Sequence, residues 1–122
     1  MDILRFEKLV GEAIERLPEE FRERLENIDI VVADTPTRAQ LKSFKEKHGH
    51  SLLGLYEGVP LTERTHEYGF VVPDKITVFH KSIEAMCRSD AQVIDEIQKV
   101  VRHEIAHHFG ISDDRLEELG RY

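Results

Sequence analysis

The sequence has little of what covalent cross-links and membrane anchors require. Cys87 is its single cysteine, which excludes a disulfide or a multi-cysteine zinc cluster within the chain. No apolar run approaches the roughly 18 residues that span a bilayer, and the first residues lack the basic and apolar segments of a secretory signal. We therefore expect a cytoplasmic protein in a reducing compartment, in which Cys87 packs as a small apolar side chain.

Positive charge is also scarce, since 17 basic residues stand against 24 acidic ones and the formal net charge is −7. Phosphate backbones and anionic lipid surfaces attract basic proteins, so we expect neither a nucleic-acid nor a membrane partner. Such a charge favours metal cations or basic partners instead. A chain of 122 residues fits one compact domain over 1–122 and leaves room only for a shallow or open site.

Periodic apolar residues predict the main elements. Helical spacing predicts an amphipathic helix over 6–17, followed by a short helix with Pro18 at its first position. The β-branched run 28–33 predicts a strand. Other patterns predict, in chain order, a helix over 36–47, strands over 52–56, 70–72 and 76–79, and helices over 81–88 and 114–119. The segments 70–72 and 76–79 could be two short strands or one interrupted strand.

The longest predicted helix, 90–109, has both of its ends marked in the sequence. Ser89 is a good N-cap and Gln92 completes a capping box, while Gly110 can adopt the left-handed conformation that ends a helix. The buried face of this helix is predicted to contain Val93, Ile94, Ile97, Val100, Val101, Ile105 and His108.

The end of this helix carries the sequence His103-Glu104-Ile105-Ala106-His107. Two histidines four residues apart lie on one face of a helix, so both imidazoles can reach one ion. Zinc accepts neutral imidazole and carboxylate ligands in tetrahedral geometry. Glu104 stands where a general base must lie to take a proton from an attacking water. The spacing predicts one zinc ion, although other divalent metals also suit two imidazoles and a carboxylate.

A third ligand is expected just beyond the helix. Gly110 lets the chain turn back, which favours Asp113 as the ligand, with Asp114 as the rival. Three protein ligands leave a fourth position for water, which is the catalytic pattern. At this composition the short motif arises by chance in roughly one chain in twenty, and the added glycine and third ligand reduce this to roughly a few in ten thousand. The extended motif therefore indicates metal binding.

The same residues also have plainer interpretations. His103 and His107 could be partly buried helix histidines, and Glu104 could be a solvated helix glutamate. Asp113 could cap the last helix, alone or while also binding metal. The other histidines are interpreted as core or helix-end (His108) or as surface and loop residues (His48, His50, His66 and His80), with His80 also placed to line a cleft.

From about Ile30 onward, the chain resembles a family of very small bacterial zincin-like metallopeptidases with the pattern His-Glu-x-x-His-x-x-Gly-x-x-Asp. The resemblance rests on that motif and on the segments 53–64, 73–79 and 113–120. It implies an α/β (α+β) fold of the minimal zincin type. In such a fold a small mixed sheet packs on the active-site helix, accompanied here by N-terminal amphipathic helices.

The resemblance also implies roles for individual residues. It makes His103, His107 and Asp113 the ligands of one zinc ion and Glu104 the acid/base. The chain departs from the metzincins, because only nine residues follow Asp113 and none is the methionine of their conserved turn. The second subdomain that closes the cleft in larger zincins is absent as well.

The leading functional hypothesis is therefore a zinc-dependent metallopeptidase acting on a peptide or protein. The substrate is expected to lie extended against a sheet edge, for which 76–79 is the candidate strand. Tyr68, Arg115 and Tyr122 are candidates for stabilising the oxyanion. The alternative is a non-catalytic zinc-binding interaction domain on a degenerate zincin scaffold, favoured by the small size and missing lid. A third hypothesis is a metal-free helical module.

Overall fold

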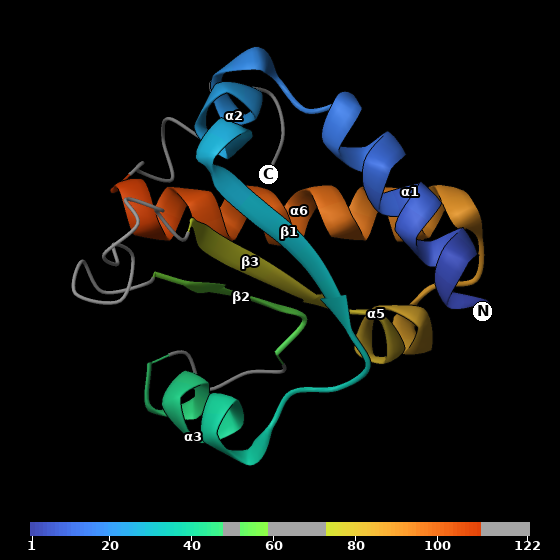
Figure 1. Cartoon of the computed structure of the whole chain (residues 1–122). Helices are drawn as coiled ribbons and strands as arrows, with labels where there is room; N and C mark the ends of the chain where they lie inside the picture. The colour runs from blue at the N-terminus through green and yellow to red at the C-terminus, as the bar shows by residue number, and fades with distance from the viewer. Residues whose placement is uncertain (48–51, 59–72, 111–122) are drawn as a thin grey trace, which may run out of the picture.

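The computed structural model describes residues 1–47, 52–58 and 73–110. In chain order, its elements are α1 (Ile3–Glu15), α2 (Glu19–Arg24), the 3-10 helix η1 (Leu25–Asn27), β1 (Ile28–Ala33), α3 (Arg38–Lys47), β2 (Gly54–Glu57), β3 (Asp74–Phe79), α5 (His80–Met86) and α6 (Asp90–Phe109). A small mixed sheet packs on α6 (Figure 1), which confirms the predicted α+β fold of the minimal zincin type. The predicted strand 70–72 and helix 114–119 lie outside the described residues.

The three strands are ordered β1-β3-β2, so β3 is the central strand. It pairs in parallel with β1, with Ile28 opposite Asp74, and antiparallel with β2, with Tyr56 opposite Ile76. The prediction that 76–79 forms the sheet edge is therefore wrong. Among the described strands, β1 and β2 form the two edges, and β2 is the edge strand that runs antiparallel to β3. Apolar side chains cover both faces of β3, which is why residues 76–79 read as a continuous buried run.

The two faces of the sheet pack against different helices. On one face, apolar side chains of α1, α2 and α6 form the main core with Ile76 and Val78 of β3. On the other face, Leu41 of α3 packs near Phe79, together with Leu52 and Leu55. Figure 1 shows α6 and α3 on opposite sides of the sheet. The sheet is thus held between helices, and α6 supplies more of the buried core residues than any other element.

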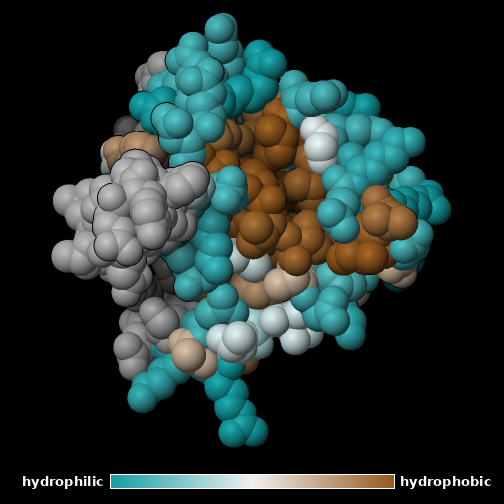
Figure 2. Space-filling model, viewed as in Figure 1, coloured by the Kyte–Doolittle hydropathy of each residue, from teal (hydrophilic) through white to brown (hydrophobic). Residues whose placement is uncertain are grey.

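The surface between α1 and β1 exposes part of this core. Apolar side chains gather there within a polar surround (Figure 2). In these two elements, Ile14, Ile28, Ile30 and Val32 are only partly buried against the core. On the far side of β1 no strand pairs with it among the described residues.

Helix α6 begins and ends where the sequence predicts. Ser89 accepts a hydrogen bond from Gln92 N at 3.2 Å, and Gly110 ends the helix with φ of 69°. Gln92 Oε1 accepts from Arg88 N rather than from Ser89 N, so the second half of the capping box is shifted by one residue. None of the described helices is both long enough and apolar enough to cross a membrane.

His80 has a different position from the one predicted. It is the first residue of α5 and is only 6% exposed, so the surface or loop interpretation is wrong. Its Nε2 lies 2.6 Å from Asp34 Oδ1 and its Nδ1 lies 3.2 Å from Glu84 Oε2. A buried imidazole is stable where both ring nitrogens find partners. These partners join the end of β1 to α5.

Candidate metal centre

The predicted zinc motif occupies the last turns of α6. His103 and Glu104 are partly buried, and His107, one turn after His103, is exposed. Helical geometry therefore puts the two histidines on one face at the surface end of the helix rather than in the apolar core. His103, Glu104 and His107 thus lie within two turns of α6, and their predicted roles as metal ligands and base stay predictions.

The remaining predicted site residues cannot be compared with the structure. Asp113, its rival Asp114, and the oxyanion candidates Tyr68, Arg115 and Tyr122 all lie outside the described residues. The predicted role of Asp113 as the third ligand therefore stays a prediction. Within residues 1–47, 52–58 and 73–110, no group of three potential ligands could hold a metal ion.

Strand β2 lies directly against α6 beside the motif. An ideal Cβ atom on Gly54 would be 2.2 Å from Val100 Cγ1 and 3.2 Å from Thr77 O, so only glycine permits this close approach. Two residues along the strand, Tyr56 N donates a hydrogen bond to Glu104 Oε1 at 2.7 Å. Val100 and Glu104 are one helical turn apart, so alternate residues of β2 meet successive turns of α6.

A second set of contacts surrounds the Tyr56 side chain. Its hydroxyl donates to Asp74 Oδ2 at 2.6 Å. Its ring stacks on His108, with centroids 3.9 Å apart and planes 11° apart. His108 Nε2 lies 4.0 Å from Asp74 Oδ2. Two carboxylates, Asp74 and Glu104, thus contact opposite ends of one tyrosine.

His108 corrects the predicted buried face of the helix. Its side chain is 41% exposed and covers the face of Tyr56 instead of entering the core. The six apolar residues predicted for that face are all buried. Position 108 falls at the open end of the helix, where the helical period continues but the core does not.

Sequence reasoning did not identify Tyr56 or Asp74 as site residues. Tyr56 appears only as the end of a strand, and Asp74 appears inside a predicted break. Asp74 in fact opens β3, two residues before Ile76 and on the same face. Extending the strand alternation backward from Ile76 would have placed this carboxylate on the α6 side of the sheet.

The donor chemistry at the end of α6 fits zinc. His103 and His107 offer imidazole nitrogens four residues apart, which suits tetrahedral coordination. Glu104 lies between them in sequence, and its Oε1 is bonded to the strand. A carboxylate held in this way stands next to the two imidazoles without needing to bind a metal itself.

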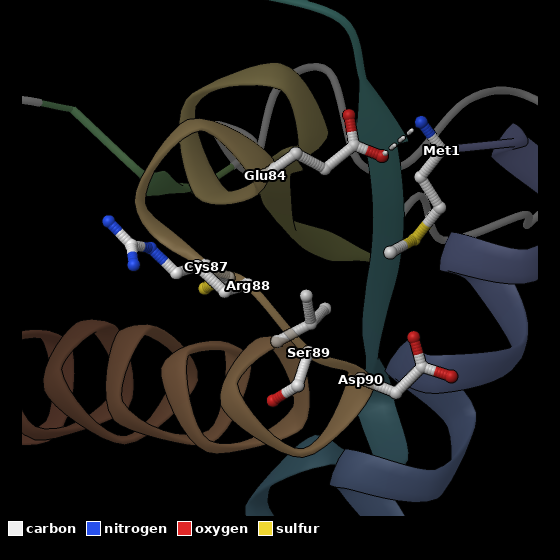
Figure 3. A pocket seen from close by; sticks show the side chains of 7 residues that line it. Met1, Glu84, Cys87, Arg88, Ser89 and Asp90 are labelled. Atoms are coloured by element: carbon white, nitrogen blue, oxygen red, sulfur yellow. Dashed lines mark ion pairs between the residues drawn. The ribbon is translucent and has the colours of Figure 1, made fainter.

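A hollow of about 240 Å³ lies at the opposite end of α6. Figure 3 shows its lining around the start of the helix, with the Met1 amine directed at Glu84, 3.6 Å from Oε1. The residues that line it are Met1, Glu84, Cys87, Arg88, Ser89, Asp90 and Val93. It contains none of the motif residues.

Comparison with known proteins agrees with this arrangement. Residues 25–121 match a family model described as zincin-like metallopeptidase. No curated protein matches the chain. Among solved structures, a conserved hypothetical protein from T. thermophilus is similar in fold, with 20% sequence identity, a TM-score of 0.54, and coverage of 89% of this chain and 94% of that one. The family match spans most of the chain and includes α6 and its motif, and the chain therefore belongs to the zincin-like metallopeptidase family.

Proposed function

We propose that this protein is a zinc-dependent peptidase whose metal is held by His103, His107 and Asp113. The observation that carries the proposal is the hydrogen bond from Tyr56 N to Glu104 Oε1, because it joins the motif helix to the edge strand of the sheet. Family membership supports the same chemistry. The metal ligands and the base then lie beside a strand that can bind an extended peptide.

Each residue of the motif has a separate task in this proposal. A zinc ion held by His103, His107 and Asp113 would supply a Lewis acid for the attacking water and the scissile carbonyl. Glu104 accepts a proton from that water and later delivers it to the leaving amine. Oε1 of this carboxylate is bonded to the strand, and we assign the proton transfer to Oε2. In this proposal, Oε1 fixes the position of the carboxylate and Oε2 carries the proton.

The substrate is proposed to align along β2 rather than along β3. Phe79 N donates to Leu53 O at 3.0 Å, which makes that pair a hydrogen-bonded one. Bonded and non-bonded pairs alternate in an antiparallel ladder, so the backbone groups of Gly54 and Tyr56 point away from β3. The Tyr56 amide bonds to Glu104, and the outward groups of Gly54 would bind the main chain of a peptide. The cleft then lies between the β2 edge and the end of α6.

The first test measures bound zinc in the full chain by elemental analysis. We expect one equivalent in wild type and its loss in His103→Ala, His107→Ala and Asp113→Ala. Asp114→Ala is the matched control for the third ligand and should keep its zinc. Zinc retained in Asp113→Ala but lost in Asp114→Ala would transfer the ligand role to Asp114, and no zinc in the wild type would refute the metal site.

The second test uses the zinc-loaded protein on a mixed peptide library. Cleavage is expected in wild type, and Glu104→Gln should bind zinc but lose activity by about a hundredfold or more. Hydrolysis that persists in Glu104→Gln would refute the base assignment. Zinc bound with every peptide intact would instead favour a non-catalytic zinc-binding domain.

A further inference from the structure

Glu104 lies near the open end of α6 and is partly buried. In the last turn of the helix, His107, His108 and Phe109 are all exposed. A glutamate in such a place has several accessible rotamers. A base in a peptidase needs one fixed carboxylate position close to the attacking water. A contact with a fixed part of the backbone would meet this requirement for Glu104.

Such a contact comes from a residue 48 positions earlier in the chain. Tyr56 N lies 2.7 Å from Glu104 Oε1, a short hydrogen bond of the charge-assisted kind. A backbone donor has no rotamers of its own, so its position is as fixed as the strand that carries it. The orientation of Glu104 thus depends on how firmly β2 is placed.

The Tyr56 side chain fixes the position of β2 through contacts with β3 and α6. Tyr56 lies opposite Ile76 in the register, so Asp74 is its diagonal neighbour on the same face of the sheet. The hydroxyl reaches Asp74 Oδ2 at 2.6 Å, and Asp74 is only 9% exposed. The ring also stacks flat on His108. The same residue is therefore bound to the central strand and to α6.

These contacts follow one row of the helix. Val100, Glu104 and His108 are four residues apart, and they meet Gly54, the Tyr56 amide and the Tyr56 ring in turn. We propose that Tyr56 is the positioning residue for Glu104, with its amide holding the carboxylate and its hydroxyl anchored by Asp74. This inference rests on the proposed peptidase function for its kinetic consequence, but the contact itself can be tested without activity.

The contact is tested first, by NMR of the full chain labelled with ¹⁵N. An amide proton that donates to a carboxylate is deshielded, so the Tyr56 amide should resonate at low field. Glu104→Gln, which removes the charge and keeps the shape, should move that resonance upfield. Tyr56→Phe keeps the amide and loses the anchor, so the residue 56 amide should exchange with solvent about tenfold faster. An unchanged shift in Glu104→Gln would overturn the inference, whatever the protein's activity.

The kinetic test compares Tyr56→Phe with a control in the same strand. Glu57→Gln is the matched control, because its side chain points to the opposite face and contacts Gln40. In Tyr56→Phe we expect kcat to fall about tenfold, KM to change less than twofold and zinc affinity to stay the same. Glu57→Gln should keep all three. A fall in zinc affinity or an equal fall in Glu57→Gln would indicate a general structural role and overturn positioning.

The NMR test and the kinetic test together distinguish failure of this inference from failure of the peptidase function on which it rests. If the NMR shifts behave as expected and no peptide is cut, the positioning contact stands and the peptidase function fails. If peptides are cut and the Glu104→Gln shift is unchanged, the function stands and the positioning role of Tyr56 fails. Asp74→Asn, measured by the same amide exchange, gives a second variant, and faster exchange at Tyr56 is expected there as well.

Discussion

Val100 on α6 packs directly against Gly54 on β2. A Cβ atom added to Gly54 would lie only 2.2 Å from Val100 Cγ1. The strand can approach the helix only because position 54 has no side chain. Two residues further on, the same approach brings the Tyr56 amide to Glu104. Packing between one glycine and one valine thus sets the geometry of the candidate site.

Gly54→Ala is therefore expected to destabilise the fold by about 1–3 kcal/mol, because the added methyl group overpacks the strand against the helix. Urea unfolding measures the change. Adding Val100→Ala in the same chain removes the clashing methyl groups and should recover part of the loss, as a double-mutant cycle would show. Additive losses in the two single variants would contradict the contact.

Gly110→Ala should cost about 1 kcal/mol, because the helix ends at this residue with φ of 69°. Among the described residues, no neighbouring atom lies within 4 Å of a Cβ placed there, so we expect the cost to come from the backbone conformation. Urea unfolding of metal-free protein isolates this effect from metal binding.

Gly11→Ala provides the matched control for that measurement. Gly11 lies within α1 and is exposed, and no atom of the described part of the chain lies within 4 Å of a Cβ added there. Alanine there should stabilise the protein by about 0.5–1 kcal/mol through helix propensity. The same substitution thus has opposite signs at two glycines, and a loss at both positions would be inconsistent with this account.

Stability should fall at acid pH through Asp34. The hydrogen bond to His80, aided by Lys81, lowers the pKa of this carboxyl below its ordinary value. Its unfolded pKa of about 3.9 then exceeds the folded one. The stabilising contribution is therefore complete above about pH 5 and is lost as the pH falls through the folded pKa. Unfolding free energies measured from about pH 6 to about pH 2.5 should decline less steeply in Asp34→Asn than in wild type.

Asp29→Asn is the control for the acid effect. Asp29 is exposed on the same strand, and the described part of the chain shows no ion pair for it. This variant should keep the pH dependence of the wild type. Identical pH profiles for Asp34→Asn and wild type would disprove the contribution of the His80 contact.

Cys87 should react slowly with thiol reagents at neutral pH. Burial is the main cause that raises the pKa of this thiol, and the nearby Glu96 and Asp95 raise it further. Because the thiolate is the reactive form, modification should be slower than for a free cysteine and should accelerate as the pH rises. Cys87 lines the hollow at the start of α6, so reagent size should matter little. Mass spectrometry of iodoacetamide labelling measures the rate, and a rate equal to that of free cysteine at neutral pH would contradict the shift.

Local signals in the sequence predicted α6 and its ends well. Ser89 and Gly110 act through contacts within a few residues, which are visible in the sequence itself. The strand 28–33 was likewise predicted with the observed bounds. The proximity of His103, Glu104 and His107 follows from helical geometry alone.

Contacts between distant segments account for what the sequence did not reveal. His80 is buried because Asp34, 46 residues earlier, bonds to it. The central place of β3 depends on its pairing with one strand on each side, which its own composition does not encode. Tyr56 gains its role only when β2 meets α6. Local pattern therefore predicted the motif, but not the strand that holds it.

The strand order has a consequence for the nascent chain. β1 and β2 are synthesised first, yet neither pairs with the other, and both need β3, which emerges later. Until Phe79 has left the ribosome, the β-branched β1 has no native partner and stays open to non-native association. The sheet then forms around β3, and the bond from Tyr56 to Glu104 must wait for α6, the last described element to be made. The three strands are therefore made before Glu104, and the growing chain cannot bind Glu104 to β2 until α6, which also supplies much of the core, has been synthesised.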